Sequence, residues 1–384
     1  MQRESIFSGE LEELISYDWP LPDIGQHSIS FGICKLSGLI MQKHTVNPSF
    51  MEQYYRSIAT YINPSASGKP TTAKVNDLDR LIDITQRGIG NIPKRVFQIG
   101  SSDGYTLHRF REAGAIDILG VDPGERSIEF AKEQYNIPCI RGNVETTNIE
   151  GLFDLCVLTH VLEHLYDPHI CLEKVKSNLD TQNGYILVEV PLWERADVQP
   201  LGVFAFEHLN YFCEHSLLKL LNNSGFETLH ISKNYYINHY PVITVLAKVS
   251  QQPLILESKS NYSKNLAIAK AYLEREMDFW NDTNSILSSA IDPDYPCYIY
   301  GGGIHTSQLI AHTPLGTEIA IESVIDSSPN KWGSKIGNYS IKSPECLNEI
   351  PTGSNIIISS LGWQEDIKNY VVSIRTDLNI ITLH

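Results

Sequence analysis

Residues 96–107, VFQIGSSDGYTL, decide the fold of this 384-residue chain. A mainly apolar run ends at Gly100, a short polar turn follows, and a helical pattern starts after Gly104. A strand that passes into a helix through a glycine turn is typical of a parallel α/β sheet, which binds a nucleotide at the carboxyl ends of its strands. The segment therefore predicts an α/β fold with a ligand site at this turn.

The alternation of strands and helices continues on both sides of this segment, from residue 95 to about residue 192. Strand-like runs such as AIDILGVD (115–122) and FDLCVLTH (153–160) alternate with helical segments, which indicates parallel strands joined by crossover helices. The runs ETLHISKNYYI and YPVITVLAKV then predict a hairpin at the sheet edge. With a helix from Thr71 or Thr72 at its start, residues 71–250 are expected to form the central domain, which is doubly wound and Rossmann-like.

The flanking segments follow other patterns. Residues 1–70 contain scattered prolines and predict an irregular N-terminal lobe that acts as a substrate lid, with one strand-like patch at 27–43. Residues 251–290 predict a linker and a long amphipathic helix, and residues 291–384 begin a second alternating pattern. We therefore expect a second, Rossmann-like α/β domain at the C-terminal end, in line with the two or three domains that this length suggests.

The composition argues against several classes of protein. A hydrophobic content of 42% and a charged content of 20% are typical of a folded chain. A net charge of −15 without clustered Lys and Arg argues against a nucleic-acid surface. The seven scattered cysteines fit reduced thiols, and no apolar run reaches the length of a signal peptide or membrane span. We expect a cytoplasmic monomer or homodimer with no nucleic-acid or membrane partner.

The glycine turn lacks the spacing of a dinucleotide site. G-x-G-x-x-G lets a pyrophosphate approach a bare helix N-terminus, but Ser102 and Tyr105 stand where the second and third glycines belong. The turn still permits close approach of a ligand without a diphosphate. S-adenosylmethionine is such a ligand, so we expect this cofactor, with S-adenosylhomocysteine as its product, rather than NAD.

Polar residues near the turn suit the rest of such a cofactor. Asp122 ends the next strand about 20 residues past the glycine turn, where an acid can accept both ribose hydroxyls. Asn143 and Val144 follow the third strand and are placed to meet the adenine. Asp103, in the turn itself, could bind the ammonium group, although Asp103 and Asp122 could each instead cap a helix.

Taken in order, QIGSSDG, GVDP, GN and FDLCVLTHVLEHLYDP resemble the successive motifs of class I S-adenosylmethionine-dependent methyltransferases over about residues 90–250. The resemblance implies a methyltransferase fold and assigns the cofactor to one set of residues. These are Gln98, Gly100, Ser102, Asp103, Gly104, Tyr105, Asp122, Pro123, Asn143, Val144 and His160.

A second block, FEHLNYF at 206–212, is similar to the E-H-x-x-Y-F segment of the bacterial nucleotide-sugar C-methyltransferases, which act on nucleotide-linked keto-deoxysugars. The resemblance implies that His208 is the catalytic base and that His164 lies near the substrate. Glu207 would bind substrate hydroxyls or orient a histidine. Tyr61 aligns loosely with a family tyrosine that reaches the substrate, but it could equally be a core aromatic.

A histidine base fits carbon methylation on chemical grounds. A carbon beside a ketone becomes nucleophilic when a base removes its proton, and histidine can do this near neutral pH. We therefore predict C-methylation of a keto-sugar. The alternatives are an O- or N-methyltransferase of another small metabolite and a scaffold protein without catalysis. His160, His164 and His208 could also be packed loop residues.

The chain departs from the family pattern at both ends. The family's N-terminal zinc module needs two Cys pairs, whereas here Cys34 has Ser37 in the place of its partner, so we expect a degenerate module and no metal. At the other end, YIYGGGIHTSQLI (298–310) has Thr306 in the place of a third glycine, and Asp326 ends the next strand. A second dinucleotide site is conceivable, but we favour a non-catalytic domain that lines the substrate cleft or an oligomer interface.

Overall fold

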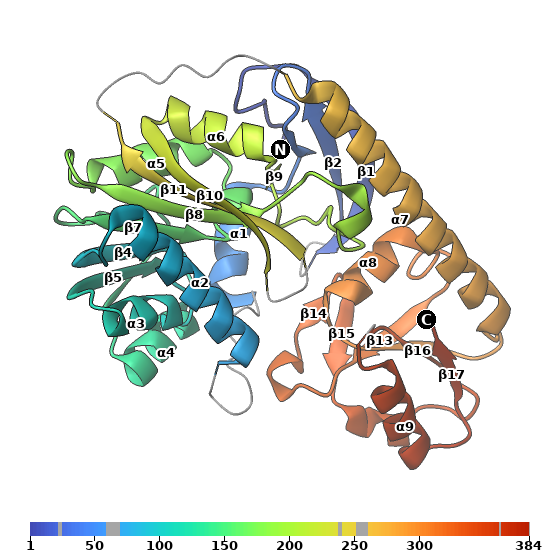
Figure 1. Ribbon diagram of the computed structural model, residues 1–384. Coiled ribbons are helices and arrows are strands. Elements are labelled where there is room, and N and C mark those ends of the chain that lie inside the picture. Colours follow the sequence, from blue (N-terminus) through green and yellow to red (C-terminus); the bar gives the residue numbers. More distant parts are fainter. Residues whose placement is uncertain (22–24, 59–69, 237–239, 251–259, 361, 384) are drawn as a thin grey trace. The chain divides into compact units, whose positions relative to one another are not determined.

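The computed structural model describes residues 1–21, 25–58, 70–236, 240–250, 260–360 and 362–383, which form two compact units (Figure 1). The first unit comprises Met1–Leu14, Phe31–Pro200 and Glu207–Ala269. The second comprises Ile15–Ser30, Leu201–Phe206 and Lys270–His384. Each contains a mainly parallel sheet with helices, so the predicted fold, a methyltransferase-type α/β sheet and a second α/β domain, is confirmed.

The first unit is built on a seven-stranded sheet in the order β10-β11-β8-β7-β4-β5-β6. The five strands from β8 to β6 are parallel, and the predicted hairpin adds β10 and β11 in antiparallel register at one edge. The strands are β4 (Arg95–Ile99), β5 (Asp117–Asp122), β6 (Cys139–Arg141), β7 (Leu155–Thr159), β8 (Tyr185–Pro191), β10 (Phe226–Tyr236) and β11 (Tyr240–Val249).

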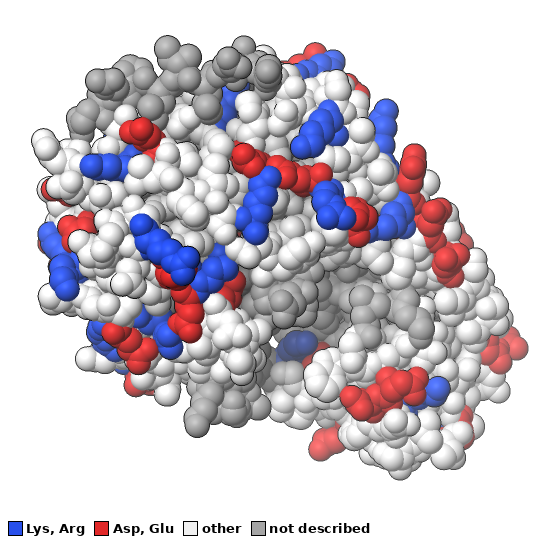
Figure 2. Space-filling view, viewed as in Figure 1, with Lys and Arg blue, Asp and Glu red and all other residues white. Residues whose placement is uncertain are grey.

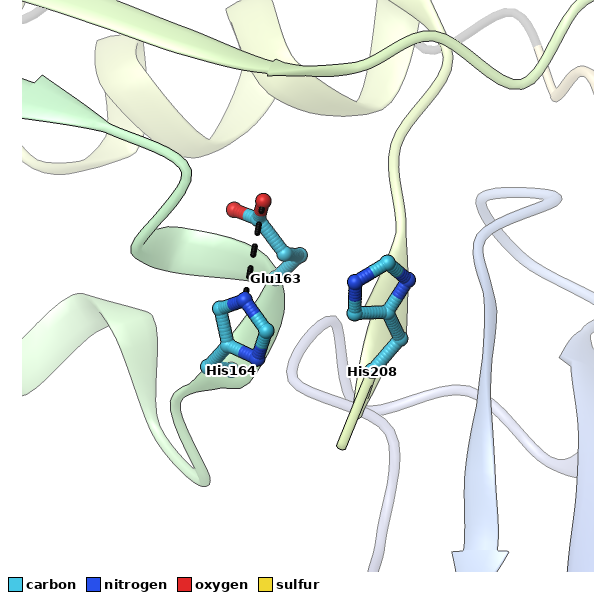
Figure 3. Close-up of side chains that lie close together, drawn as sticks. All are labelled: Glu163, His164 and His208. Carbon is cyan, nitrogen blue, oxygen red and sulfur yellow. Dashed lines mark ion pairs between the residues drawn. The ribbon is translucent and has the colours of Figure 1, made fainter. Parts of the chain in front are cut away.

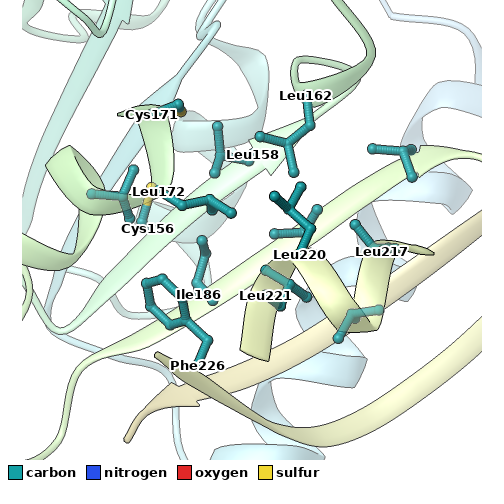
Figure 4. Close-up of a cluster of buried hydrophobic side chains, with 14 of the residues drawn as sticks. Cys156, Leu158, Leu162, Cys171, Leu172, Ile186, Leu217, Leu220, Leu221 and Phe226 are labelled. Carbon is teal, nitrogen blue, oxygen red and sulfur yellow. The ribbon is translucent and has the colours of Figure 1, made fainter. Parts of the chain in front are cut away.

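Helices cover both faces of this sheet because its inner strands are apolar on both sides. In β7, Leu155 and Val157 pack with residues of α2, α3 and α4, whereas Cys156 and Leu158 pack with α5 and α6 (Figure 4). The helices are α2 (Thr72–Ile89), α3 (Tyr105–Glu112), α4 (Glu125–Tyr135), α5 (Pro168–Ser177) and α6 (Glu214–Asn223).

The N-terminal segment is more regular than predicted. Three strands, β1 (Leu11–Leu21), β2 (Gly25–Cys34) and β3 (Ile40–His44), join the short β9 (Asn210–Tyr211) in a sheet of order β1-β2-β3-β9. The strand-like patch at 27–43 is thus confirmed, but the prediction of an otherwise irregular lobe is wrong. The period-two signal of β1 is real, since Tyr17, Trp19 and Leu21 are all buried, but Pro20 obscured it.

Two further helical segments follow β3, namely α1 (Pro48–Gln53) and the π-helical turn η1 (Tyr54–Ile58). Asn47 begins α1, because its side-chain oxygen accepts the N–H of Phe50 at 2.8 Å. Short 3₁₀ turns, η2 (Leu162–His164) and η3 (Ala196–Val198), follow β7 and β8. The antiparallel pairing of β9 with β3 fixes the loop that carries His208.

The second unit contains a six-stranded sheet of order β14-β15-β13-β12-β16-β17 and, from Lys270 onward, the predicted long helix. Residues 71–250, predicted as one domain, lie in the first unit except for Leu201–Phe206. The elements are α7 (Tyr262–Ala290), β12 (Cys297–Tyr300), α8 (Ile304–His312), β13 (Ile321–Ile325), η4 (Pro329–Lys331), β14 (Lys335–Ile336), β15 (Tyr339–Lys342), η5 (Pro344–Asn348), β16 (Asn355–Ile358), α9 (Gln364–Ile374) and β17 (Asn379–Thr382).

On the face shown in Figure 2, Lys and Arg side chains lie among Asp and Glu side chains rather than in one basic patch. This fits the expectation that the chain has no nucleic-acid partner, which stays a prediction. Within the described ranges, no helix combines the length and the apolar character needed to cross a membrane.

Candidate active site

A cavity of about 730 Å³ lies in the first unit, at the carboxyl ends of the parallel strands. The loops after β4, β5, β6 and β7 form most of its wall, together with residues of α1, α2 and β8. The structure brings most of the predicted site residues together here. Those that line the cavity are Gln98, Gly100, Ser102, Asp103, Asp122, Pro123, Asn143, Val144, His160, His164 and His208.

Four predicted residues are placed otherwise. Gly104 and Tyr105 lie at the start of α3 and are not part of the cavity wall as described. A Cβ at Gly104 would stand 2.6 Å from the Cβ of Ala131, so this glycine lets α3 pack closely against α4. Glu207 is buried beside the cavity without lining it, and Tyr61 lies outside the described residues.

The glycine turn is held by Asp122. Its carboxylate accepts the N–H groups of Ser102 and Gly124, each at 2.8 Å, and so ties the loop after β4 to the loop after β5. Burial raises the pKa of Asp122, and these two donors oppose that effect. Since each carboxylate oxygen has two lone pairs, both can still accept a ligand hydroxyl. At Gly100, a Cβ would lie 2.6 Å from Cγ2 of Val161.

Asp103 has partners within the chain. It accepts a hydrogen bond from Nζ of Lys74 at 2.6 Å and from the N–H of Tyr105 at 3.1 Å. The second bond stabilises the start of α3, as the helix-capping alternative requires. Asp103 still borders the cavity, so capping and ligand contact are compatible.

His160 lies between two buried carboxylates. Its Nδ1 is 3.4 Å from Oε1 of Glu163, and its Nε2 is 3.6 Å from Oε1 of Glu189. Burial by itself lowers the pKa of His160, but the two carboxylates outweigh burial and raise it to about 9. The ring is therefore an imidazolium at neutral pH.

Arg80 extends this buried charge network, which the sequence did not predict. Its Nη2 lies 2.6 Å from Oδ1 of Asp77 and 2.7 Å from Oε2 of Glu189, and Thr244 also donates to Glu189. Asp77 and Glu189 come from α2 and β8, more than a hundred residues apart, so only the fold unites them. The one sequence signal was a glutamate inside the apolar strand YILVEVP.

His164 has a defined tautomer. Its Nδ1 lies 2.9 Å from the backbone carbonyl oxygen of Glu207 and 2.9 Å from the hydroxyl of Tyr55. Because a carbonyl only accepts, Nδ1 carries the hydrogen, and the neutral ring keeps a lone pair on Nε2. Burial lowers the pKa of His164, which favours this neutral form.

His208 lies beside His164, with ring centroids 4.9 Å apart. Burial lowers the pKa of His208 to about 3, so its ring is neutral at neutral pH. Oxygen of Glu163 and ring nitrogens of the two histidines lie within 4.8 Å of one another (Figure 3). The two histidines that the sequence predicted to converge are thus neighbours on one side of the cavity.

Glu207 acts on this pair through its backbone, because its carbonyl oxygen holds Nδ1 of His164. Its carboxylate accepts a hydrogen bond from the hydroxyl of Tyr54. Burial raises the pKa of Glu207 to about 7, and the Tyr54 hydroxyl opposes that rise. Of the two roles predicted for Glu207, this geometry suits orienting a histidine.

Residues 76–231, less than half of the chain, match the family model described as a methyltransferase domain. The central part of the chain is therefore similar to a methyltransferase domain. No curated protein matches the chain.

Several solved structures are similar. One is the magnesium protoporphyrin IX methyltransferase of Synechocystis PCC 6803 with bound SAH, at 15% identity and a TM-score of 0.43, covering 53% of this chain and 100% of that one. A 1,6-didemethyltoxoflavin-N1-methyltransferase from Burkholderia thailandensis has 14% identity and a TM-score of 0.43, covering 58% and 96%. The N-methyltransferase NodS of Bradyrhizobium japonicum has 12% identity and a TM-score of 0.39, covering 47% and 97%.

Proposed function

We propose that this chain is an S-adenosylmethionine-dependent methyltransferase whose active site is the cavity of the first unit. The observation that carries the proposal is the charge of this cavity at the glycine turn. S-adenosylmethionine bears a sulfonium, an ammonium and one carboxylate, so its net charge is positive and an acidic cavity favours it. The acids of the wall are Glu52, Asp77, Asp103, Asp122, Glu145, Glu163 and Glu189.

The acceptor that we propose is a nucleotide-linked keto-deoxysugar, methylated at the carbon beside its ketone. His208 removes a proton from this carbon, and the C–H electrons form an enolate. The enolate carbon attacks the methyl group, a C–C bond forms, the S–CH₃ bond breaks, and S-adenosylhomocysteine leaves. Glu163 has an oxygen within 4.8 Å of the His208 ring and would stabilise the imidazolium that forms.

His164 would accept a hydrogen bond from a substrate hydroxyl through Nε2. Its tautomer supports this role, because the Glu207 carbonyl holds the hydrogen on Nδ1. Tyr55 contacts the same Nδ1 and lines the cavity, so it limits how far the ring can turn. Two imidazoles with different tasks therefore account for the two histidine motifs.

A second candidate is an O- or N-methyltransferase that acts on another small molecule. The acidic wall favours it, because carboxylates repel the diphosphate of a nucleotide-linked sugar. Under the first proposal, the diphosphate must lie beyond this wall. The two candidates share the cofactor site and differ in the acceptor atom.

Hydrogen exchange at the acceptor carbon separates these candidates. With a keto-sugar in deuterated water and S-adenosylhomocysteine in place of the methyl donor, we expect the wild type to exchange the hydrogen beside the ketone. His208→Gln should abolish this exchange and change the affinity for S-adenosylmethionine less than about threefold, because His208 supplies only the base. If the wild type methylates an acceptor in a separate assay with S-adenosylmethionine but catalyses no such exchange, the acceptor atom would instead be an oxygen or a nitrogen.

We further propose that the protein acts in the cytoplasm as a monomer or homodimer. A small-molecule acceptor requires no macromolecular partner, and the wall residues of the cavity all belong to one unit of one chain. Light scattering of the purified full chain would measure the oligomeric state.

A further inference from the structure

Glu163 presents a buried carboxylate without hydrogen bonds. Its side chain is 1% exposed, and neither oxygen has a hydrogen-bond partner among the residues that the structure describes. The distances to Nδ1 of His160 (3.4 Å) and Nε2 of His164 (3.9 Å) exceed those of ordinary hydrogen bonds. A buried carboxylate is costly unless a cation or donors compensate it. The His160 imidazolium compensates Glu163 only in part, because it lies beyond ordinary hydrogen-bond distance and is shared with Glu189, so a further cation can still bind here.

Two histidine nitrogens face the same point as this carboxylate. Nε2 of His164 has a lone pair, and its ring is oriented by the bond from Nδ1 to the Glu207 carbonyl. Histidines that bind metals are held by the same kind of second hydrogen bond. His208 completes the group, since the ligand atoms of all three residues lie within 4.8 Å of one another (Figure 3).

We propose that Glu163, His164 and His208 bind one divalent transition-metal ion of the zinc class. Two imidazoles and one carboxylate are a donor set that such ions favour. Ligand distances of about 2.0–2.1 Å place the ligand atoms of a tetrahedral zinc ion roughly 3.4 Å apart. The Glu163–His164 pair is at 3.9 Å and no pair of ligand atoms is more than 4.8 Å apart, so the side chains must move closer by about 0.5 to 1.4 Å to close the site.

Three protein ligands leave one coordination position of the ion open. All three residues line the cavity, so water or an acceptor oxygen could take this position. The site differs from the zinc module considered for the N-terminal segment, which rested on Cys34 and lacked a second cysteine at Ser37. It also departs from the expectation that the chain holds no metal.

The ion would regulate catalysis by occupying the base. A lone pair that coordinates a metal cannot accept a proton, so zinc bound to His208 blocks proton abstraction from the acceptor. This consequence rests on the proposed function, whereas metal binding does not. We therefore expect zinc to inhibit turnover, and a chelator to restore it.

The direct test measures metal binding to the full chain after dialysis against a chelator. We expect one equivalent of Zn²⁺ to bind, and Co²⁺ in its place to give visible ligand-field absorption bands. His164→Gln and His208→Gln should each weaken binding at least about tenfold. The control is His108→Gln on α3, because His108 also lies near a glutamate, at 3.5 Å from Glu112, but lies away from the cavity wall described.

A wild type that gives no cobalt bands would overturn the site, and so would ligand variants that bind zinc as tightly as the wild type. If a histidine variant fails to fold, the site can still be tested by the zinc affinity of Glu163→Gln, which should be lower than that of the wild type, and by the cobalt spectrum of the wild type. If the chain binds the metal but its metal-free form catalyses no exchange on any keto-sugar, the proposed function would be overturned and the site would stay in place. Exchange that persists with the site saturated by zinc would overturn the regulation.

Discussion

The two units contain similar glycine turns with different surroundings. In the first unit, β4 enters α3 through Gly100, and Asp122 ends the neighbouring strand. In the second, β12 enters α8 through a run of glycines from Gly301, and Asp326 follows the neighbouring strand β13. Both aspartates accept backbone N–H groups from their turns, so the local topology is shared.

The difference lies in what else each aspartate binds. Asp122 accepts two backbone N–H groups and borders a cavity. Asp326 accepts N–H groups of Gly302 and Ser328 and also the ammonium of Lys331 at 3.0 Å. Asp326 is therefore paired with a lysine of the chain itself, so the same local topology has different electrostatic surroundings in the two units.

The largest expected effect concerns buried charge. Arg80→Met removes the guanidinium that Asp77 and Glu189 share and leaves Glu189 with His160 alone, so we expect the free energy of unfolding to fall by about 3 kcal/mol. Lys331→Met removes a single partly exposed pair, for which we expect about 1 kcal/mol. Urea unfolding of both variants measures the difference. Equal losses would show that the buried charge network of the first unit stabilises the fold no more than the Lys331–Asp326 pair does.

Histidine burial gives the next contrast, because His312 of the second unit is buried as a neutral ring, whereas His160 of the first unit is buried as an imidazolium. His312 stacks on Trp280, with centroids 4.7 Å apart, and burial lowers its pKa to about 4. In the unfolded chain a histidine binds its proton near pH 6.5, so the unfolded state gains protons first as the pH falls. The stability that His312 contributes is thus present above pH 6.5 and lost toward pH 4.

From these values we expect a loss of about 3 kcal/mol between pH 6.5 and pH 4. Urea midpoints across this range should fall further for the wild type than for His312→Phe, which keeps an aromatic ring on Trp280 but cannot be protonated. The comparison of the two proteins cancels the carboxylates that titrate in the same range. If the urea midpoints of the two proteins fell in parallel with pH, His312 would be solvated in the native state.

A smaller effect is expected for ligand binding at the two turns. Asp122→Asn removes one negative charge from the cavity and turns a donor toward the N–H groups of Ser102 and Gly124. We expect the dissociation constant for S-adenosylmethionine to rise about 10- to 100-fold, as for hydrogen bonds to charged groups. Asp326→Asn should leave it within about twofold. Calorimetric titration measures the dissociation constants of both variants. A larger effect of Asp326→Asn would mean that the cofactor binds in the second unit.

The sequence predicted the sheet and the turn well because their signals are local. The run VFQIG, the glycines and the acid about 20 residues later all lie within one strand–helix–strand unit. The helix after Thr71 was predicted for the same reason, since the Thr71 side chain caps it locally. Local periodicity and turn chemistry are what a single sequence encodes most directly.

The buried charge network could not be predicted in the same way. Asp77, Arg80, His160, Glu163 and Glu189 come from several elements, and a charged residue on a helix is usually solvated. Only the packing of α2 against the hairpin edge of the sheet brings Arg80 to Glu189. The way in which Glu207 orients a histidine was similarly hidden, because it acts through a backbone carbonyl that any residue could supply.

The smallest effect is expected at Lys74, the nearest counterpart of Lys331 in the first unit. Lys74 pairs with Asp103 at 2.6 Å, but the two side chains are 33% and 21% exposed, compared with 24% and 11% for Lys331 and Asp326. Exposed pairs contribute little, so Lys74→Met should change the free energy of unfolding by about 0.5 kcal/mol or less.

The same substitution makes the cavity more acidic, because Lys74 belongs to its wall. We therefore expect S-adenosylmethionine to bind slightly more tightly, by less than about threefold, and S-adenosylhomocysteine, which lacks the sulfonium charge, to change less. Raising the salt concentration should remove the difference, since exposed charges are screened. Weaker binding of the cofactor to Lys74→Met would mean that Lys74 contacts the cofactor carboxylate. The lysine of the first unit would then bind a ligand, whereas Lys331 of the second unit pairs with an aspartate of the chain.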